Sequence, residues 1–233
     1  MRASMASRLA LASLSVAIAV VAGCGGASVR TCGVPSACGG GEACVLGRCA
    51  REGEPSPIRP DTRQIVLEPD SLAFVTSGEE IGRVRPPYVA LGADVGDAAR
   101  ILLTFPAPTW SSDRVVRAYL VLDRVQAAEA GPGQVTLRAE RVVEPWSQKG
   151  ELRTTWASPP RSEPMPGADA LVAPRGSAPI RIDVTPYAVA LATKGATSWG
   201  LRVEARGTGY GVPIATGFGA TGAPPRLEVY VQR

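Results

Sequence analysis

From about residue 61 onward, apolar and polar residues alternate with a period of two, and this pattern restricts the fold more than any other feature. In residues 115–123, one face carries only apolar residues and the other carries Arg117 and Tyr119. The same alternation occurs in residues 180–184, 199–205 and 227–231. Side chains at alternate positions of a β-strand point to opposite faces. The pattern therefore predicts antiparallel sheet with one packed and one solvated face, and it places Trp199 on the packed face of its strand.

Further apolar segments add strands, and turn-forming residues separate them. The additional predicted strands are residues 101–105 and 135–143, with weaker ones at 71–76 and 214–218. The 26 glycines and 21 prolines favour many turns over long helices. One short helix is expected at residues 187–194, with Thr185 as its cap, Pro186 in its first turn and Gly195 after its end. The predicted fold is an all-β, jelly-roll antiparallel β-sandwich with one short helix.

The first residues have the pattern of a secretory signal. Two arginines precede an apolar stretch of 14 residues, 9–22, which is shorter than the roughly 20 residues that span a bilayer. Residues 21–24 read Val-Ala-Gly-Cys and resemble the lipobox of bacterial lipoproteins. We therefore expect residues 1–23 to be a signal peptide and Cys24 to carry the lipid that attaches the protein to the membrane. The alternative is an ordinary signal peptide with an incidental cysteine. Gly25 after the cysteine favours the outer membrane, by resemblance to the sorting rule of Gram-negative lipoproteins.

A small glycine-rich, cysteine-rich module is expected at residues 24–50. It is too short to build a core, so two disulfides are the expected source of its stability. Its four remaining cysteines are Cys32, Cys38, Cys44 and Cys49, which allow three connectivities. A zinc site is the alternative, but the C-x₂-C pairs typical of such sites are missing from the sequence. The module resembles short cysteine modules of surface lipoproteins from myxobacteria and their relatives. Residues 51–60 contain three prolines and are expected to form a stiff linker before a domain at residues 61–233.

Composition excludes several classes of chemistry. The chain has no histidine, and its five cysteines all lie before residue 50, which removes histidine-dependent and thiol catalysis from the main domain. Without residues 1–23 the charge is 23 basic minus 21 acidic residues, or +2. Basic residues and aromatics do not cluster together, so nucleic acid is not an expected partner. Asp94 and Asp97 could ligate calcium, but they are more simply part of a turn; no metal or cofactor is predicted.

Eight short motifs, in order, connect the domain to a known family. They are residues 70–75, 99–105, 115–120, 143–146, 154–159, 182–185, 199–203 and 225–229. In this order and spacing they resemble the disaggregatase-related, or DNRLRE-domain, family, which is grouped with carbohydrate-binding module family 96. The resemblance implies a jelly-roll sandwich and a non-catalytic module on a secreted or surface protein, and some members of the family bind polysaccharides, including acidic ones. The chain departs from the family pattern at residues 157–158 and 215–218, so the resemblance implies no ligand contacts for these residues.

Exposed aromatic rings are the expected sugar-binding groups, because they stack on the faces of pyranose rings. The candidates are Trp110, Trp146, Trp156, Tyr119 and Tyr210. Arg117 is a candidate for contact with uronate carboxylates. The alternatives are that Trp146 and Trp156 pack the 144–159 loop over the sandwich, and that arginines such as Arg117 form cross-strand pairs with acidic residues.

We expect a non-catalytic lipoprotein that presents a polysaccharide-binding module at the cell surface. The first alternative is a structural or adhesive protein that contacts another protein and has no sugar site. The second is an extracytoplasmic hydrolase, which requires two carboxylates about 5–10 Å apart in a cleft. The 21 acidic residues permit such a pair, but none of them lies in a recognisable catalytic motif.

Overall fold

The structure is a computed structural model of the whole chain. It describes residues 38–39, 42–45, 48–51, 61–77, 87–92, 99–126, 134–147, 154–172, 176, 178–193, 198–206, 211–219 and 222–233. Several predicted features lie outside these ranges: the signal peptide, Cys24, Cys32, most of the linker, Asp94, Asp97 and Tyr210.

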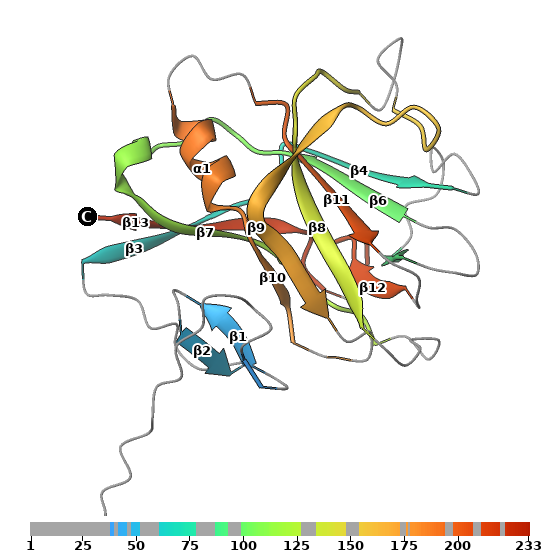
Figure 1. Cartoon of the computed structure of the whole chain (residues 1–233), viewed down its shortest axis with the longest axis horizontal. Helices are drawn as coiled ribbons and strands as arrows, with labels where there is room; N and C mark the ends of the chain where they lie inside the picture. The colour runs from blue at the N-terminus through green and yellow to red at the C-terminus, as the bar shows by residue number, and fades with distance from the viewer. Residues whose placement is uncertain are drawn as a thin grey trace, which may run out of the picture.

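Two antiparallel sheets form the main domain (Figure 1). The four-stranded sheet has the order β10 (Ile180–Asp183), β7 (Val115–Leu122), β13 (Arg226–Gln232) and β3 (Thr62–Leu67). The five-stranded sheet has the order β4 (Ser71–Thr76), β6 (Ala99–Thr104), β11 (Leu201–Arg206), β8 (Val135–Val142) and β9 (Ser162–Val172). The predicted all-β antiparallel sandwich is confirmed.

The chain passes repeatedly from one sheet to the other, as it does in a jelly roll. Successive strands lie in different sheets at the steps from β3 to β4, β6 to β7, β7 to β8, β9 to β10 and β10 to β11. A separate pair of strands, β5 (Tyr88–Leu91) and β12 (Val212–Ala215), is linked to the end of β7 by a bridge between Arg124 and Ile214.

The inner faces of the two sheets form one apolar core. On β7 the alternate residues Ala118, Leu120 and Leu122 are fully buried, and Ile101 and Leu103 face them from the other sheet. Each fully buried leucine or isoleucine contributes about 1.5–3 kcal/mol to stability. The period-two pattern of the sequence therefore identified the core-facing residues of these strands.

The pattern wrongly predicts that Val116 faces the core. Val116 has the same parity as Ala118, yet it is 39% exposed. The pairing between β7 and β13 shifts its register between Tyr230 and Val231, opposite the start of β7. Beyond this irregularity β7 no longer keeps its alternate residues over the core, because a register shift changes what each face covers.

The helix α1 (Thr185–Ala192) follows β10 directly, and Pro186 lies in its first turn as predicted. Thr185 is not the cap, because the cap position belongs to Val184. Instead, the carboxylate of Asp183 accepts hydrogen bonds from the Thr185 backbone N–H at 3.0 Å and from its hydroxyl at 2.6 Å. The backbone N–H of Ala118 donates to the same hydroxyl at 2.9 Å. These bonds join the start of α1 to β7, which α1 packs against together with β9 and the 3₁₀ turn η2 (Ser112–Arg114).

The sequence did not predict β9, because two prolines and a glycine interrupt it. Pro164, Pro166 and Gly167 lie within this strand. In the described part of the chain, β9 pairs on one side only, with β8. An edge strand tolerates proline because the missing N–H would not have donated to a second neighbour. Strands β3 and β5 were also not predicted.

The cysteine-rich module contains a short hairpin of β1 (Glu42–Val45) and β2 (Arg48–Arg51). A disulfide joins Cys38 to Cys49, whose Cα atoms lie 5.4 Å apart. This bond is compatible with one of the three possible connectivities.

Candidate functional site

The outer face of the five-stranded sheet carries a row of alternating charges. Glu204 on β11 lies opposite Arg138 on β8, and Arg138 lies opposite Asp169 on β9. Arg138 donates two hydrogen bonds to Asp169, at 2.7 and 2.9 Å. On the other side of the row, the Arg100 guanidinium lies 3.2 Å from the Glu204 carboxylate. Opposite charges on neighbouring strands stabilise the pairing of those strands.

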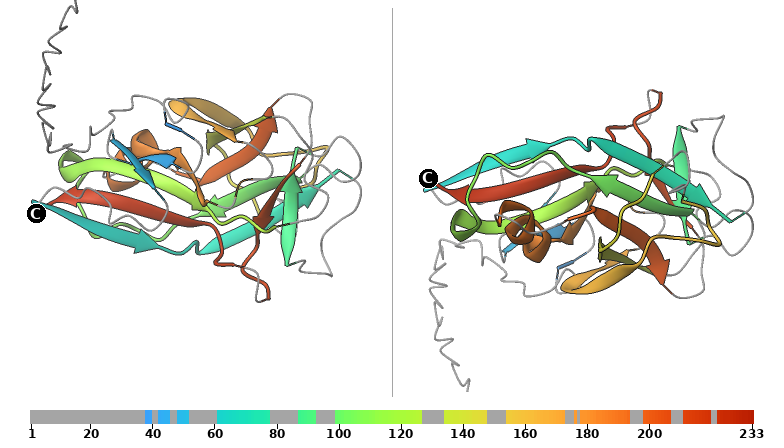
Figure 2. Two further views of the ribbon diagram at one scale, coloured as in Figure 1. Left: turned by 90° about the horizontal axis from the view of Figure 1, so that it is seen from below. Right: turned by 90° about the horizontal axis from the view of Figure 1, so that it is seen from above.

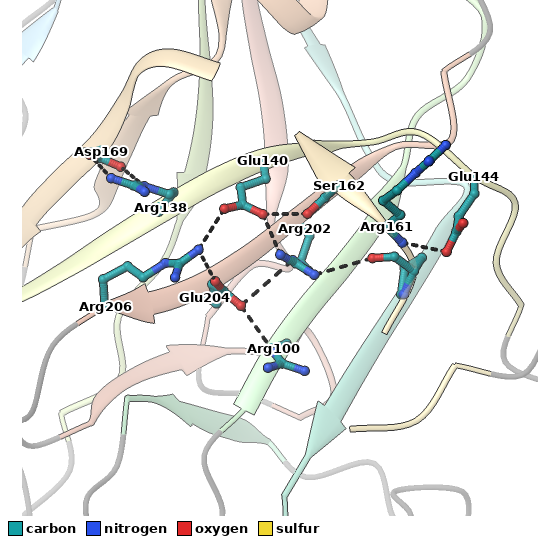
Figure 3. Close-up of polar contacts among 11 residues, drawn as sticks. Arg100, Arg138, Glu140, Glu144, Arg161, Ser162, Asp169, Arg202, Glu204 and Arg206 are labelled. Atoms are coloured by element: carbon teal, nitrogen blue, oxygen red, sulfur yellow. Dashed lines mark hydrogen bonds and ion pairs between the residues drawn. The ribbon is translucent and has the colours of Figure 1, made fainter. Parts of the chain in front are cut away.

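A second row, centred on Glu140, lies beside the first (Figure 3). Arg202 lies opposite Glu140 in the strand register and donates to its carboxylate, as does the Ser162 hydroxyl. Arg206 donates to the other carboxylate oxygen at 2.9 Å and also forms an ion pair with Glu204 at 2.7 Å. We call these eight residues the charge network: Arg100, Arg138, Glu140, Ser162, Asp169, Arg202, Glu204 and Arg206.

Burial makes the charge network unusual for an outer sheet face. The side chain of Glu140 is only 5% exposed, and those of Arg202 and Glu204 are 14% and 12% exposed. Burial raises the pKa of Glu140, but the hydrogen bonds and charges of Ser162, Arg202 and Arg206 together outweigh it and hold that pKa below its ordinary value. The four arginines and three carboxylates leave one excess positive charge. The lowered pKa keeps Glu140 ionised among these arginines.

The segment of residues 154–160 lies over this face. Arg100 donates to the Trp156 carbonyl at 3.0 Å, and its guanidinium carbon lies 3.8 Å from the centre of the Trp156 ring. Arg202 donates to the Pro160 carbonyl at 3.3 Å. A guanidinium stacked on an indole ring gains both cation–π and packing energy. Trp156 thus has a packing role here, as the loop-packing alternative proposed.

Backbone contacts close the ends of the loop that carries these residues. The Thr154 N–H donates to the Ser147 carbonyl at 2.9 Å, and Val143 donates to the Arg161 carbonyl at 3.0 Å. The Arg161 N–H donates to the Glu144 carboxylate at 2.6 Å (Figure 3). The two arms of the loop are therefore bonded to each other, and Arg100 and Arg202 bond its second arm to the sheet.

Trp146 and Trp199 lie together near the closed end of this loop. The indole N–H of Trp146 donates to the Trp199 carbonyl at 2.7 Å, and the Trp199 side chain is 37% exposed. Trp146 is partly buried. We call these two residues the tryptophan surface.

The prediction that Trp199 belongs to the core is wrong, and Gly200 explains why. Gly200 has a φ of +106°, a conformation that breaks the strand alternation between Trp199 and Leu201. A Cβ atom at Gly200 would lie 1.9 Å from the Leu103 carbonyl oxygen, so only glycine fits there. Because the chain turns at this residue, Leu201 enters the core while Trp199 faces outward.

Other predicted site residues are not available as sugar-stacking groups. Trp110 is 7% exposed and belongs to the core, and Tyr119 is 3% exposed. Arg117 forms an ion pair with Asp183, as the cross-strand alternative proposed. The predictions that Trp110 and Tyr119 are exposed binding groups are therefore wrong. Trp110 packs in the core, and the cover over Tyr119 on its outer sheet face cannot be read from sequence parity.

The sequence predicted cross-strand charge pairs on a solvated face, but it did not predict that such pairs join into the buried centre of the charge network. Charged residues occur at alternate positions of two strands. They are Arg138 and Glu140 in β8, and Arg202, Glu204 and Arg206 in β11. Two charged stripes with the same period pair up when their strands are neighbours. The missing information was the strand order.

In the described part of the chain, three or more potential metal ligands do not gather at any point. Among the described residues, none of the helices is long and apolar enough to cross a membrane. Comparison with models of known protein families gave no match, and comparison with curated proteins gave none either. The resemblance to the DNRLRE-domain family therefore stays a prediction.

Proposed function

We propose that this protein is a non-catalytic lipoprotein of the cell envelope, anchored through lipid on Cys24, whose sandwich binds polysaccharide at the tryptophan surface. The observation that supports the binding site is the exposure of Trp199, whose backbone carbonyl accepts a hydrogen bond from the indole of Trp146 on the 144–159 loop. Rings held in place before a ligand arrives lose little conformational entropy on binding. Such rings suit the flat faces of sugar residues.

The charge state of Glu140 does not suit this residue to the acid role in glycoside hydrolysis. Glycoside hydrolysis needs one carboxyl group with a raised pKa to protonate the leaving oxygen. The pKa of Glu140 is lowered instead, and its oxygens are occupied by Ser162, Arg202 and Arg206. This carboxylate is thus suited to structural support of the loop.

The membrane part of the proposal rests on the sequence of residues 1–24. The Cys24→Ala variant should move the protein from the membrane fraction to the soluble fraction, because the lipid attachment point is lost. Retention of that variant in the membrane fraction would refute the anchor.

Glycan binding by the purified protein tests the proposed site. Trp199→Ala and Trp146→Ala should each weaken binding about tenfold, as expected when roughly 1.4 kcal/mol of stacking is lost. Tyr88→Ala is the matched control, because Tyr88 is 40% exposed but lies on β5, in the separate strand pair. Unchanged binding in both tryptophan variants would rule out this surface.

The burial of Trp110 and Tyr119 favours a second candidate function, an adhesive or structural protein that contacts another protein. It makes a different prediction in the same experiment. If the wild-type protein binds neither acidic nor neutral glycans, the result would favour this function over sugar binding.

A further inference from the structure

Two tyrosines on the outer face of the four-stranded sheet are as buried as core residues. Tyr119 on β7 is 3% exposed and Tyr230 on β13 is 1% exposed. Their neighbours in the strands, such as Leu120 and Val229, belong to the core, so the tyrosines point to the opposite face. The two rings pack edge to face with their centres 6.1 Å apart. A bare outer face would leave such rings in contact with water, so something covers them.

The cysteine hairpin, formed by strands β1 and β2, lies on this side of the sheet. Strand β1 contacts β10, which is the neighbour of β7, and Asp183 of β10 lies opposite Tyr119. In Figure 1 the hairpin lies below β7 and β13, and from below it lies in front of β7 (Figure 2, left). The disulfide between Cys38 and Cys49 closes this segment into a compact unit.

We propose that the cysteine hairpin is a docked part of the sandwich, and that its binding surface is the outer face of the four-stranded sheet around Tyr119 and Tyr230. The occupant is the chain's own N-terminal segment, not a second protein. Tyrosines suit such an interface, because each ring buries a large apolar area while its hydroxyl keeps a polar partner. The Tyr230 hydroxyl donates to Glu228 at 3.3 Å.

Docking has a consequence for the proposed function, and this consequence rests on lipidation at Cys24. The lipid-bearing residue precedes the hairpin closely in sequence, and the hairpin holds the four-stranded sheet. The charge network lies on the outer face of the other sheet, so it faces away from the hairpin. The anchor would then orient the sandwich instead of letting it rotate freely.

Tyrosine nitration of the full chain, read by peptide mass spectrometry, tests the docking. A protease site introduced within residues 52–59 allows the hairpin to be cut from the sandwich and removed by gel filtration. After removal, nitration of Tyr119 and Tyr230 should become at least tenfold faster. Tyr88, exposed in both forms, is the reactive control, and Tyr187 in the core, 1% exposed, reports that the sandwich stays folded. Co-elution of the cut fragment with the sandwich, with both tyrosines still protected, also supports docking.

Loss of the fragment with Tyr119 and Tyr230 still as slow as Tyr187 would overturn the proposal. If Tyr187 also becomes reactive, the sandwich has unfolded, and a measurement on the uncut chain decides. Nuclear Overhauser effects should then connect protons of residues 42–51 to the ring of Tyr119 or Tyr230. If no such effects to residues 42–51 are seen, while effects between the rings of Tyr119 and Tyr230 are seen, the docking proposal is overturned. Neither measurement involves glycan or lipid, so failure here is distinct from failure of the proposed function.

Discussion

Part of each outer face of the sandwich is protected from water, but by opposite means. The five-stranded sheet buries carboxylates and guanidiniums that satisfy one another, with Glu140 at the centre and residues 154–160 above them. The four-stranded sheet buries the rings of Tyr119 and Tyr230 on the side where the cysteine hairpin lies. An alternating strand pattern therefore indicates which residues face the core but not whether the other face is solvated.

The two faces should respond differently to substitution. Removing one member of a buried charge cluster leaves its partners charged and unpaired, which costs far more than the cluster contributes. A buried aromatic face depends mainly on apolar area and shape, so a smaller apolar residue retains much of its energy. Four predictions, from the largest effect to the smallest, test this contrast.

The largest effect is expected for Glu140→Gln. This change preserves size but removes the negative charge that Arg202 and Arg206 contact. The free energy of unfolding, measured by urea denaturation, should fall by about 3 kcal/mol.

The matched control for that change is Glu163→Gln. Glu163 also pairs with an arginine, at 2.7 Å from Arg141, but its side chain is 57% exposed. Exposed ion pairs contribute about 0–1 kcal/mol. Equal losses in the two variants would show that burial of the charge network has no energetic consequence.

Acid should weaken the same face first. Because the pKa of Glu140 is lower in the folded protein than its ordinary value of 4.5, its contribution is complete above pH 4.5. The contribution is lost as the pH falls through the folded pKa. The stability difference between wild type and Glu140→Gln should therefore shrink as the pH falls below 4.5, measured by urea denaturation between pH 7 and pH 3. A constant difference over this range would contradict the ionised state of Glu140.

On the four-stranded face, Tyr119→Leu should cost only about 1–1.5 kcal/mol. Leucine retains part of the buried apolar area but loses the edge-to-face contact with Tyr230. Urea denaturation is again the measurement, with Val66→Ala as the control, because Val66 lies on the same sheet but is 50% exposed. A loss as large as that of Glu140→Gln would remove the contrast between the two faces.

Much of the fold followed from local patterns. Strands with strict alternation, such as residues 227–231 in β13, were predicted because their core contacts depend on parity alone. β9 was missed because Pro164 and Pro166 are compatible with a strand only at a sheet edge, and edge position depends on strand order. Long-range topology is therefore what the local pattern lacked.

The candidate site was less predictable than the fold. The sequence identifies Trp146 as a candidate from its place in a loop. It places Trp199 in the core, because the sequence does not show that Gly200 has a left-handed backbone conformation. Trp110 and Tyr119 were named because aromatic residues were expected at the surface, and their burial depends on segments distant in sequence. Residue type suggests a chemistry, whereas exposure is decided by tertiary packing.

The smallest effect is expected at the rim of the charge network, in the pair Arg138 and Asp169. Their two hydrogen bonds have good geometry, but the side chains are 36% and 46% exposed. A double-mutant cycle with Arg138→Ala and Asp169→Ala should give a coupling energy of about 0.2–1 kcal/mol. Added salt should reduce this coupling, because exposed charges are screened. A coupling of several kcal/mol would mean that the rim behaves like Glu140, so the boundary between the buried and solvated parts of this face would have to move outward to β9.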